Sequence, residues 1–199
     1  MKERILSANS GWLVLAIVVA VLSLGVAAVA QDDDFGRTGF YVAAMGSYSV
    51  ENFDTDATGV DVKNALGFDL RTGYRLHPNV AVEGSFQHYR ERELQPPGGP
   101  SVELLSWGFW LNFKFYPITG KVQPYALIGP GFMHLDAGRS RLLRISRDDN
   151  GFSPRGGVGL DVYLTKSIAA TVEASYVFTT VDIEDKDHIP VTWGFTYRF

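Results

Sequence analysis

Apolar and polar residues alternate along eight segments of the chain, the period-2 pattern of a β-strand whose two faces meet different surroundings. The last segment shows this pattern most clearly. In Val191–Phe199 every second residue is apolar or aromatic, and the residues between them are small or polar. The predicted strands are residues 39–50, 66–76, 80–87, 105–116, 122–133, 157–164, 168–178 and 190–199.

The fifth predicted strand, residues 122–133, is the least regular of the eight. Its two faces differ little in polarity, and Pro124 and Pro130 each remove a hydrogen-bond donor from the strand ladder. The pattern therefore predicts a strand here but not its register.

Short and long connections alternate between these strands. The short ones follow the second, fourth and sixth strands and contain turn residues such as His77-Pro78-Asn79. The long ones are approximately residues 52–63, 91–100, 136–150 and 179–188. In transmembrane barrels the short turns face the periplasm and the long loops face outward. The chain is therefore predicted to be all-β, an eight-stranded antiparallel up-and-down transmembrane β-barrel.

The first thirty residues have the three parts of a secretory signal peptide. Lys2 and Arg4 precede an apolar run, residues 12–22, and Ala28-Val29-Ala30 is a small-residue cleavage site. An uncleaved membrane anchor is the alternative, because residues 12–30 are long enough to cross a bilayer. Cleavage is favoured, since basic residues occur only before the run and acids follow it. We predict a signal peptide, residues 1–30, and one outer-membrane β-barrel domain, residues 31–199.

The composition narrows the class of protein. Hydrophobic residues make up 46% of the chain, and no second apolar run is long enough for a membrane helix. The mature chain can therefore cross a membrane only as strands. It has no cysteine, and a closed barrel does without disulfides because every strand is paired. The net charge of -4 argues against general nucleic-acid binding.

The charged residues indicate which face of each strand meets lipid. A Lys or Arg at mid-depth on the lipid side costs about 2 to 4 kcal/mol. Within the predicted strands, the charged residues fall on the face opposite the bulky apolar one. These residues are Asp69, Arg71, Arg75, Glu83, Lys114, Asp161, Glu173 and Arg198. We expect them to pair across a narrow lumen, which predicts a filled interior rather than a wide water channel.

Three segments carry a resemblance to small outer-membrane β-barrels. They are Arg37-Thr38-Gly39-Phe40-Tyr41-Val42, Val122-Gln123-Pro124-Tyr125 and Phe195-Thr196-Tyr197-Arg198-Phe199. The mature chain resembles the family that includes the OmpA N-terminal barrel, OmpX and the opacity-type adhesins, often described as the porin family. The resemblance implies an integral protein of the outer membrane of a Gram-negative bacterium.

The resemblance also implies partners. In that family the final aromatic strand is recognised by the barrel-assembly machinery, and the matching residues here are Tyr197 and Phe199. The peptidoglycan-binding domain of full-length OmpA-like proteins has no counterpart in this sequence, so anchoring to the cell wall is not implied. Outer-membrane lipid and lipopolysaccharide are the other expected partners.

The third long connection contains a cluster of arginines, namely Arg139, Arg141, Arg144 and Arg147. An extracellular loop would place them near lipopolysaccharide phosphates, which guanidinium groups bind through bidentate hydrogen bonds. The alternative is ordinary solvated loop charge. These arginines are therefore candidate lipopolysaccharide contacts.

Catalytic and metal sites are not predicted. On its face of the third strand His88 has Phe86 and Arg90 as neighbours, so no serine nucleophile lies beside it on that strand. Residues 54–59 match the first half of a calcium loop, but Ala65 stands where the bidentate Glu is needed. We therefore expect no enzyme activity, no metal and no cofactor.

Two classes of function remain. The favoured one is a structural or surface-interaction barrel that displays extracellular loops. The alternative is a small pore or transport barrel, or a soluble lipocalin-like barrel that binds a ligand. Lipocalins keep apolar residues inside, whereas the bulky aromatic residues of this chain would overfill a cavity if they were turned inward.

Overall fold

The computed structural model describes residues 35–51, 61–62, 65–95, 102–137, 148–178 and 188–199. The predicted signal peptide, residues 1–30, and the arginine cluster of the third long connection lie outside these ranges. Among the residues described, no helix is long and apolar enough to span a membrane.

The described residues form β-strands joined by turns. In chain order the strands are β1 (Gly39–Glu51), β2 (Asp61–Val62), β3 (Ala65–His77), β4 (Val80–Gln95), β5 (Val102–Phe115), β6 (Val122–Gly129), β7 (Gly131–Ala137), β8 (Asp148–Phe152), β9 (Arg155–Tyr163), β10 (Ile168–Val177) and β11 (His188–Arg198).

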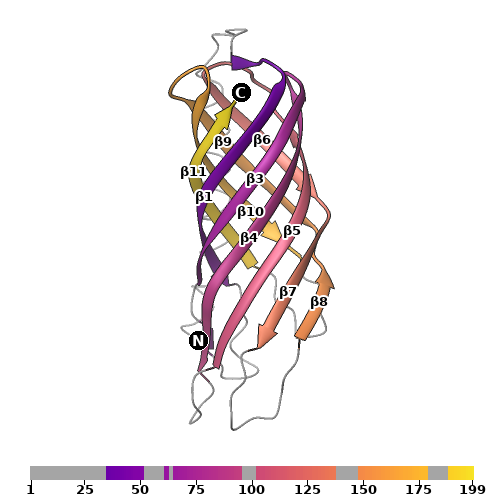
Figure 1. Cartoon of the computed structure of the whole chain (residues 1–199), viewed down its shortest axis with the longest axis vertical. Coiled ribbons are helices and arrows are strands. Elements are labelled where there is room, and N and C mark those ends of the chain that lie inside the picture. Colours follow the sequence, from indigo (N-terminus) through magenta and orange to yellow (C-terminus); the bar gives the residue numbers. More distant parts are fainter. Residues whose placement is uncertain (1–34, 52–60, 63–64, 96–101, 138–147, 179–187) are drawn as a thin grey trace, which may run out of the picture.

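The strands close into a ring, as Figure 1 shows. Neighbours pair antiparallel around the ring, with β6 and β7 in line as one barrel strand and β8 and β9 in line as another. The pairing of β1 with β11 joins the first barrel strand to the last, and the pairing of β4 with β5 completes the circle. The predicted eight-stranded antiparallel barrel is therefore confirmed.

The fifth predicted strand is interrupted at Pro130, between β6 and β7. Proline has no N–H for the ladder, although its carbonyl still accepts a hydrogen bond from the Leu111 N–H at 3.0 Å. At this point the partner strand on one side changes from β9 to β8. Pro124, in contrast, lies within β6 opposite Leu160.

Several strands run further toward the long connections than the sequence pattern predicts. β4 continues to Gln95, β5 begins at Val102, and β2 pairs with the end of β4. The prediction of loops is therefore wrong for parts of three ranges. β2 lies within residues 52–63, the end of β4 within 91–100, and parts of β7 and β8 within 136–150. Beyond the membrane a strand needs no lipid-facing side, so the apolar alternation disappears while the backbone pairing continues. In Figure 1, β4 and β5 extend past β1 at this end.

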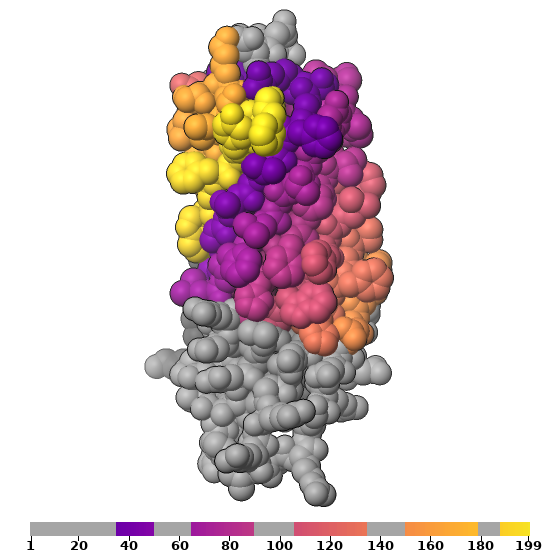
Figure 2. All heavy atoms as spheres, viewed as in Figure 1, coloured from indigo at the N-terminus to yellow at the C-terminus, as the bar shows by residue number. Residues whose placement is uncertain are grey.

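The outward side chains are apolar and exposed, the reverse of a soluble protein. Phe40 is 63% exposed, Phe109 53% and Phe195 61%. Figure 2 shows side chains of β1, β3 and β4 packed next to one another over this outer face. Inward side chains such as Gln87 and Asn112 are polar and fully buried. Because such an outer face suits lipid and not water, the predicted assignment of faces is confirmed.

Candidate functional site

Five charged side chains meet inside the barrel and form what we call the salt-bridge layer. Arg71 Nη2 lies 2.7 Å from Asp69 Oδ2, and Arg71 Nη1 lies 2.6 Å from Glu173 Oε2. Lys114 Nζ lies 2.6 Å from Glu83 Oε2. Glu83 is also 3.6 Å from Arg71, and Glu173 is 3.9 Å from Lys114. The two clusters are therefore joined into one buried layer.

The layer depends on closure of the ring. Arg71 on β3 and Glu173 on β10 are 102 residues apart in the chain and share hydrogen bonds of 2.6 and 3.0 Å. Two strands, β1 and β11, separate β3 from β10 in the ring. Strand alternation turns both side chains inward, and the narrow lumen brings them together.

Two inward-facing tyrosines complete the coordination of the acids. Tyr41 OH donates to Glu83 Oε2 at 3.0 Å, and Tyr125 OH donates to Glu173 Oε2 at 2.8 Å. The sequence alternation places Tyr41 on the inward face but does not indicate which acid it would contact. Each of these two carboxylates thus has both a cation and a phenol as partners, which satisfies its buried oxygens.

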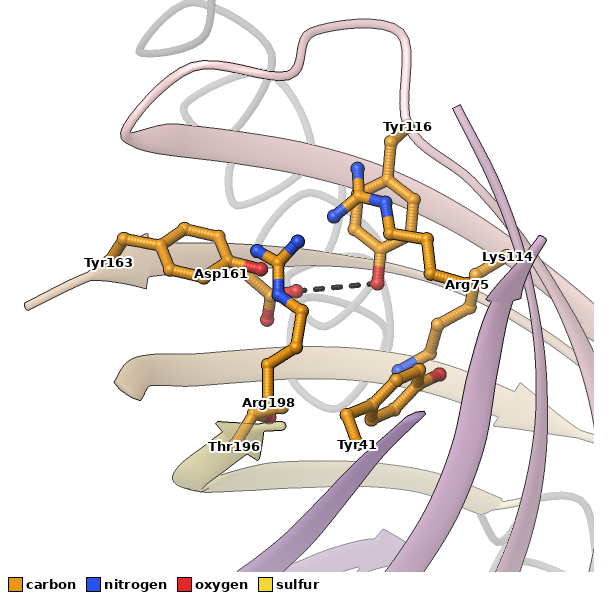
Figure 3. A pocket seen from close by; sticks show the side chains of 8 residues that line it. All are labelled: Tyr41, Arg75, Lys114, Tyr116, Asp161, Tyr163, Thr196 and Arg198. Carbon is orange, nitrogen blue, oxygen red and sulfur yellow. Dashed lines mark hydrogen bonds between the residues drawn. The ribbon is translucent and has the colours of Figure 1, made fainter. Parts of the chain in front are cut away.

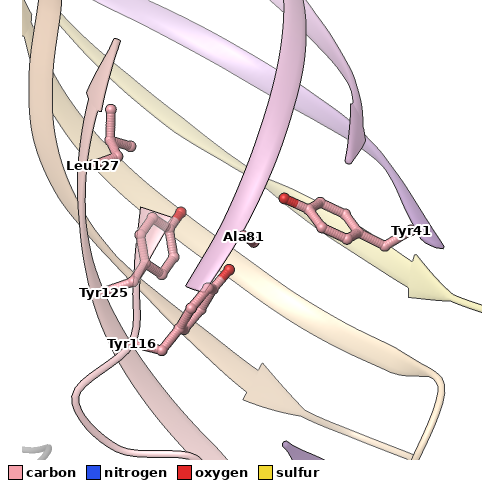
Figure 4. Packing of buried hydrophobic residues seen from close by; sticks show 5 residues of the cluster. All are labelled: Tyr41, Ala81, Tyr116, Tyr125 and Leu127. Atoms are coloured by element: carbon pink, nitrogen blue, oxygen red, sulfur yellow. The ribbon is translucent and has the colours of Figure 1, made fainter. Parts of the chain in front are cut away.

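Aromatic rings fill the lumen by lying over glycines of neighbouring strands. A Cβ atom added to Gly73 would stand 2.3 Å from the ring of Tyr41, and one added to Gly159 would stand 2.3 Å from the ring of Tyr125. Figure 4 shows the buried cluster to which these rings belong, which consists of Tyr41, Ala81, Tyr116, Tyr125 and Leu127. The absent Cβ atoms make room for the rings, so the lumen is filled with side-chain atoms.

A further buried arginine, Arg155 on β9, lies inside the barrel. Its Nε donates to Asn112 Oδ1 at 2.8 Å, its Nη2 donates to Ser85 Oγ at 3.0 Å, and its guanidinium lies 5.1 Å from the centre of the Trp110 ring. The sequence pattern does not place Arg155 in the lumen, because the predicted strand begins at Gly157. Continuing the alternation by one step toward the N-terminus would have placed it in the lumen.

At the end of the barrel where the short turns lie, residues 35–37 lie against the lumen, and we call them the N-terminal strap. Arg198 Nη2 donates to Phe35 O at 2.7 Å, and Arg198 Nη1 donates to Arg37 O at 2.8 Å. Gln123 Nε2 also donates to Phe35 O, at 2.9 Å. The predicted lumen charge Arg198 therefore holds the main chain of the strap.

A small chamber lies between the strap and the salt-bridge layer. Its volume is about 10 Å³, which is room for one water molecule. Tyr116 OH donates to Asp161 Oδ2 across it at 3.3 Å, as Figure 3 shows. Tyr116 lies just after β5, and burial raises the pKa of its phenol well above the ordinary value, which keeps it a donor. The side chains that line the chamber are Tyr41, Arg75, Lys114, Tyr116, Asp161, Tyr163, Thr196 and Arg198.

The eight predicted lumen charges are all inside the barrel and no more than 4% exposed. The structure brings five of them together in the salt-bridge layer. The other three lie nearer the short turns, where Arg75 donates to Pro78 O and Gln123 Oε1, and Asp161 accepts from Thr171 at 2.7 Å. Within the described ranges, no group of three or more His, Asp or Glu side chains is placed to hold a metal ion.

Comparison with a protein-family sequence model then decides the family. The model of the outer membrane protein beta-barrel domain matches residues 16–199. The chain belongs to this family. As an outer membrane beta-barrel domain protein, it is an integral protein of the outer membrane of a Gram-negative bacterium, and bilayer lipid covers its exposed aromatic face. The short turns therefore mark the periplasmic end, and the long connections mark the extracellular end.

Solved structures of outer membrane beta-barrel proteins share the fold. OprG from Pseudomonas aeruginosa superposes with a TM-score of 0.60 at 14% identity, over 83% of this chain and 98% of OprG. The N-terminal β-barrel of OprF from the same organism gives 0.53 at 14%, over 81% of this chain and 100% of that domain. Ail from Yersinia pestis gives 0.52 at 22%, over 81% of this chain and 97% of Ail. No curated protein sequence matches the chain.

Proposed function

We propose that this outer-membrane barrel is a non-catalytic, non-conducting protein that stabilises the envelope and presents its extracellular end for interactions at the cell surface. The observation that carries this proposal is the salt-bridge layer. It crosses the lumen between the periplasmic chamber and the extracellular half, and its members are fully or almost fully buried.

The energetics support a closed lumen. Arg71 makes two hydrogen bonds to Glu173 and two to Asp69. Breaking a buried ion pair by removing one partner costs about 3 to 5 kcal/mol. If separating the ion pairs costs a similar free energy, only about one molecule in 10² to 10⁴ has an open layer at any moment. Steady ion flow through the barrel is therefore not expected.

Three alternatives receive less support, namely a pore, a lipocalin-like barrel and a catalytic role. A pore needs continuous water, whereas ion pairs and rings occupy the lumen here. A lipocalin-like barrel needs an apolar cavity, whereas the inward positions carry Asp69, Arg71 and Glu173. A catalytic role lacks support at His88, whose ring faces the ring of Phe68 at 5.3 Å.

The pairing of β4 and β5 at the extracellular end is consistent with the proposed surface role. Beyond a register shift between Tyr89 and Arg92, β4 and β5 pair again up to Leu94 and Val102. A paired hairpin of this length is a rigid support for the connection at its tip. We further propose that Tyr197 and Phe199, which are 46% and 67% exposed on the outer face, are the residues that the barrel-assembly machinery recognises.

Conductance of the purified protein in planar bilayers tests the closed lumen. We expect little steady current from protein whose ring is shown to be closed by a shift on an unboiled gel. Large, stable currents from protein that passes this gel test would contradict the proposal and favour the pore.

Lipopolysaccharide retention tests the surface role of the third long connection. Replacing its four arginines together with glutamine should leave the gel shift unchanged and lower the amount of lipopolysaccharide that co-purifies, more so at low salt. The arginines replaced are Arg139, Arg141, Arg144 and Arg147. Unchanged retention by the folded variant would mean that they are ordinary solvated loop charge.

A further inference from the structure

Two histidines flank a tryptophan on the lipid-facing side of the barrel. The strand register aligns His88 on β4 directly with Trp107 on β5, and Trp107 directly with His134 on β7. The rings of Trp107 and His134 lie 4.9 Å apart. Asn150 on β8 continues the same row, and its Oδ1 lies 2.6 Å from His134 Nδ1. We call His88, Trp107 and His134 the histidine row.

The histidine row lies at the level where the outer leaflet ends. On β5 the outward ring of Phe115 is at the periplasmic end, and Trp107 is eight residues further along. Eight residues of strand span about 27 Å, which is about 20 Å along the membrane normal at a tilt of about 40°. The apolar band of a bacterial barrel is about 25 Å tall. Trp107 therefore lies near the extracellular boundary of the band, where lipid headgroups begin.

Imidazoles at this level need polar partners. Tryptophan is common at the membrane boundary, but an imidazole facing lipid loses hydrogen bonds that water would supply. The contact with Asn150 occupies Nδ1 of His134, so Nε2 is the ring nitrogen that this contact leaves for a further partner. The polar groups that this boundary offers in the outer leaflet are the sugar and phosphate groups of lipopolysaccharide. A protonated imidazole binds phosphate through a charge-assisted hydrogen bond.

We propose that the histidine row is a binding site for a phosphate group of the lipid A part of lipopolysaccharide, and that it binds more tightly as the imidazoles become protonated. The site goes beyond the proposed surface role and is separate from the arginines of the third connection. It requires only the outer-membrane position of the barrel. Neither a closed lumen nor a loop contact is needed for it.

Charged residues occur on each of the strands that surround the row. On β3, which packs against His88, the outward neighbour is Phe68, and the charged residues Asp69 and Arg71 face the lumen. Toward the extracellular end, β4 carries Glu91 and Glu93 along with Arg90 and Arg92, and β5 carries Glu103. β7 and β8 carry the acids Asp136, Asp148 and Asp149. Charged residues of both signs thus occur on the strands toward the extracellular end of the row.

Fluorescence of Trp107 provides a direct measurement. Diphosphoryl lipid A is titrated into the folded full-length protein in neutral detergent at pH 6 and at pH 8. Tryptophan fluorescence follows the titration, and the spectra of ligand-free wild type and a Trp107→Phe variant identify the part of the signal that comes from Trp107. We expect binding about tenfold tighter at pH 6, which corresponds to one charge-assisted hydrogen bond. Lipid A without phosphates should show no such difference.

Matched variants identify the residues responsible. The double variant His88→Gln, His134→Gln should lose the part of the pH dependence that comes from the imidazoles. Any pH dependence that remains should come from titration of the lipid phosphates. His77→Gln, at an exposed periplasmic turn, should behave as wild type. The proposal would be overturned if the double variant shows the closed-barrel gel shift and an unchanged pH dependence. It would also be overturned if the wild-type protein binds lipid A without phosphates with the same pH dependence. Replacing the four loop arginines would leave this pH dependence unchanged, so failure here and failure of the loop contact can be told apart.

Discussion

Replacing Arg71 with methionine removes the cation that serves three buried carboxylates. The distances from its guanidinium are 2.7 Å to Asp69, 2.6 Å to Glu173 and 3.6 Å to Glu83. Methionine has a similar length and packs in the same space, but it removes the ion pair of Asp69 and leaves Lys114 as the only cation of the salt-bridge layer for Glu83 and Glu173. Removing one partner of a buried pair typically costs about 3 to 5 kcal/mol. We expect the free energy of unfolding to fall by about this amount.

Arg75→Met is the matched control. Arg75 lies on the same strand and the same face, four residues away, and is equally buried. It donates to Pro78 O and to Gln123 Oε1, and it stacks on the Tyr116 ring at 4.1 Å. Because these partners are neutral, losing the hydrogen bonds should cost only about 1 to 3 kcal/mol. Urea unfolding in lipid vesicles, followed by tryptophan fluorescence, gives both values.

A rescue variant separates charge from packing. Adding Glu173→Gln to Arg71→Met removes one of the unpaired acids, so it should restore part of the lost stability. If Arg71→Met costs no more than Arg75→Met, or if Glu173→Gln restores nothing, the ion pairs of Arg71 do not stabilise the barrel.

Two further pairs of substitutions test the wall of the barrel. Leu111→Arg lies midway between the membrane boundaries on β5 and should lower folding stability in vesicles by about 2 to 4 kcal/mol. Phe115→Arg lies at the periplasmic boundary and should cost only about 0 to 1 kcal/mol. Equal costs would contradict the assigned depth of these two residues. Gly73→Ala should lower the free energy of unfolding by about 1 to 3 kcal/mol, because the added Cβ would lie 2.3 Å from the ring of Tyr41. Gly84→Ala should be tolerated, because the nearest atom to its added Cβ lies 3.9 Å away. Comparable urea midpoints for the two alanine variants would refute the packing of rings over glycines.

The sequence predicts the barrel and its inward charges because both depend on local periodicity. A strand that separates lipid from a polar lumen must alternate, so Arg71, Lys114 and Glu173 could be assigned to the lumen from residue parity alone. Arg155 escaped only because the predicted strand began two residues too late. The partners of each charge could not be predicted, since the contact of Arg71 with Glu173 depends on ring closure and lumen width.

The ends of the strands were harder to predict for a different reason. Beyond the lipid boundary the outer face of β4 meets water, so the apolar signal disappears although backbone pairing with β5 continues. The N-terminal strap was also unforeseen. Its binding site is built from Gln123 on β6 and Arg198 on β11, which come together only in the closed ring.

The seam between β1 and β11 has a consequence for the order of folding. It joins the two ends of the domain, and the strap contact beside it spans 161 residues between Arg37 and Arg198. Contacts at such separation form late, because the intervening chain must first lose its conformational freedom. Until then β1 and β11 are both open edges, and β11 carries the exposed rings of Trp193 and Phe195. A chain waiting in the aqueous periplasm would thus be prone to edge-to-edge aggregation, so closure is the step at which an assembly factor gives the greatest protection.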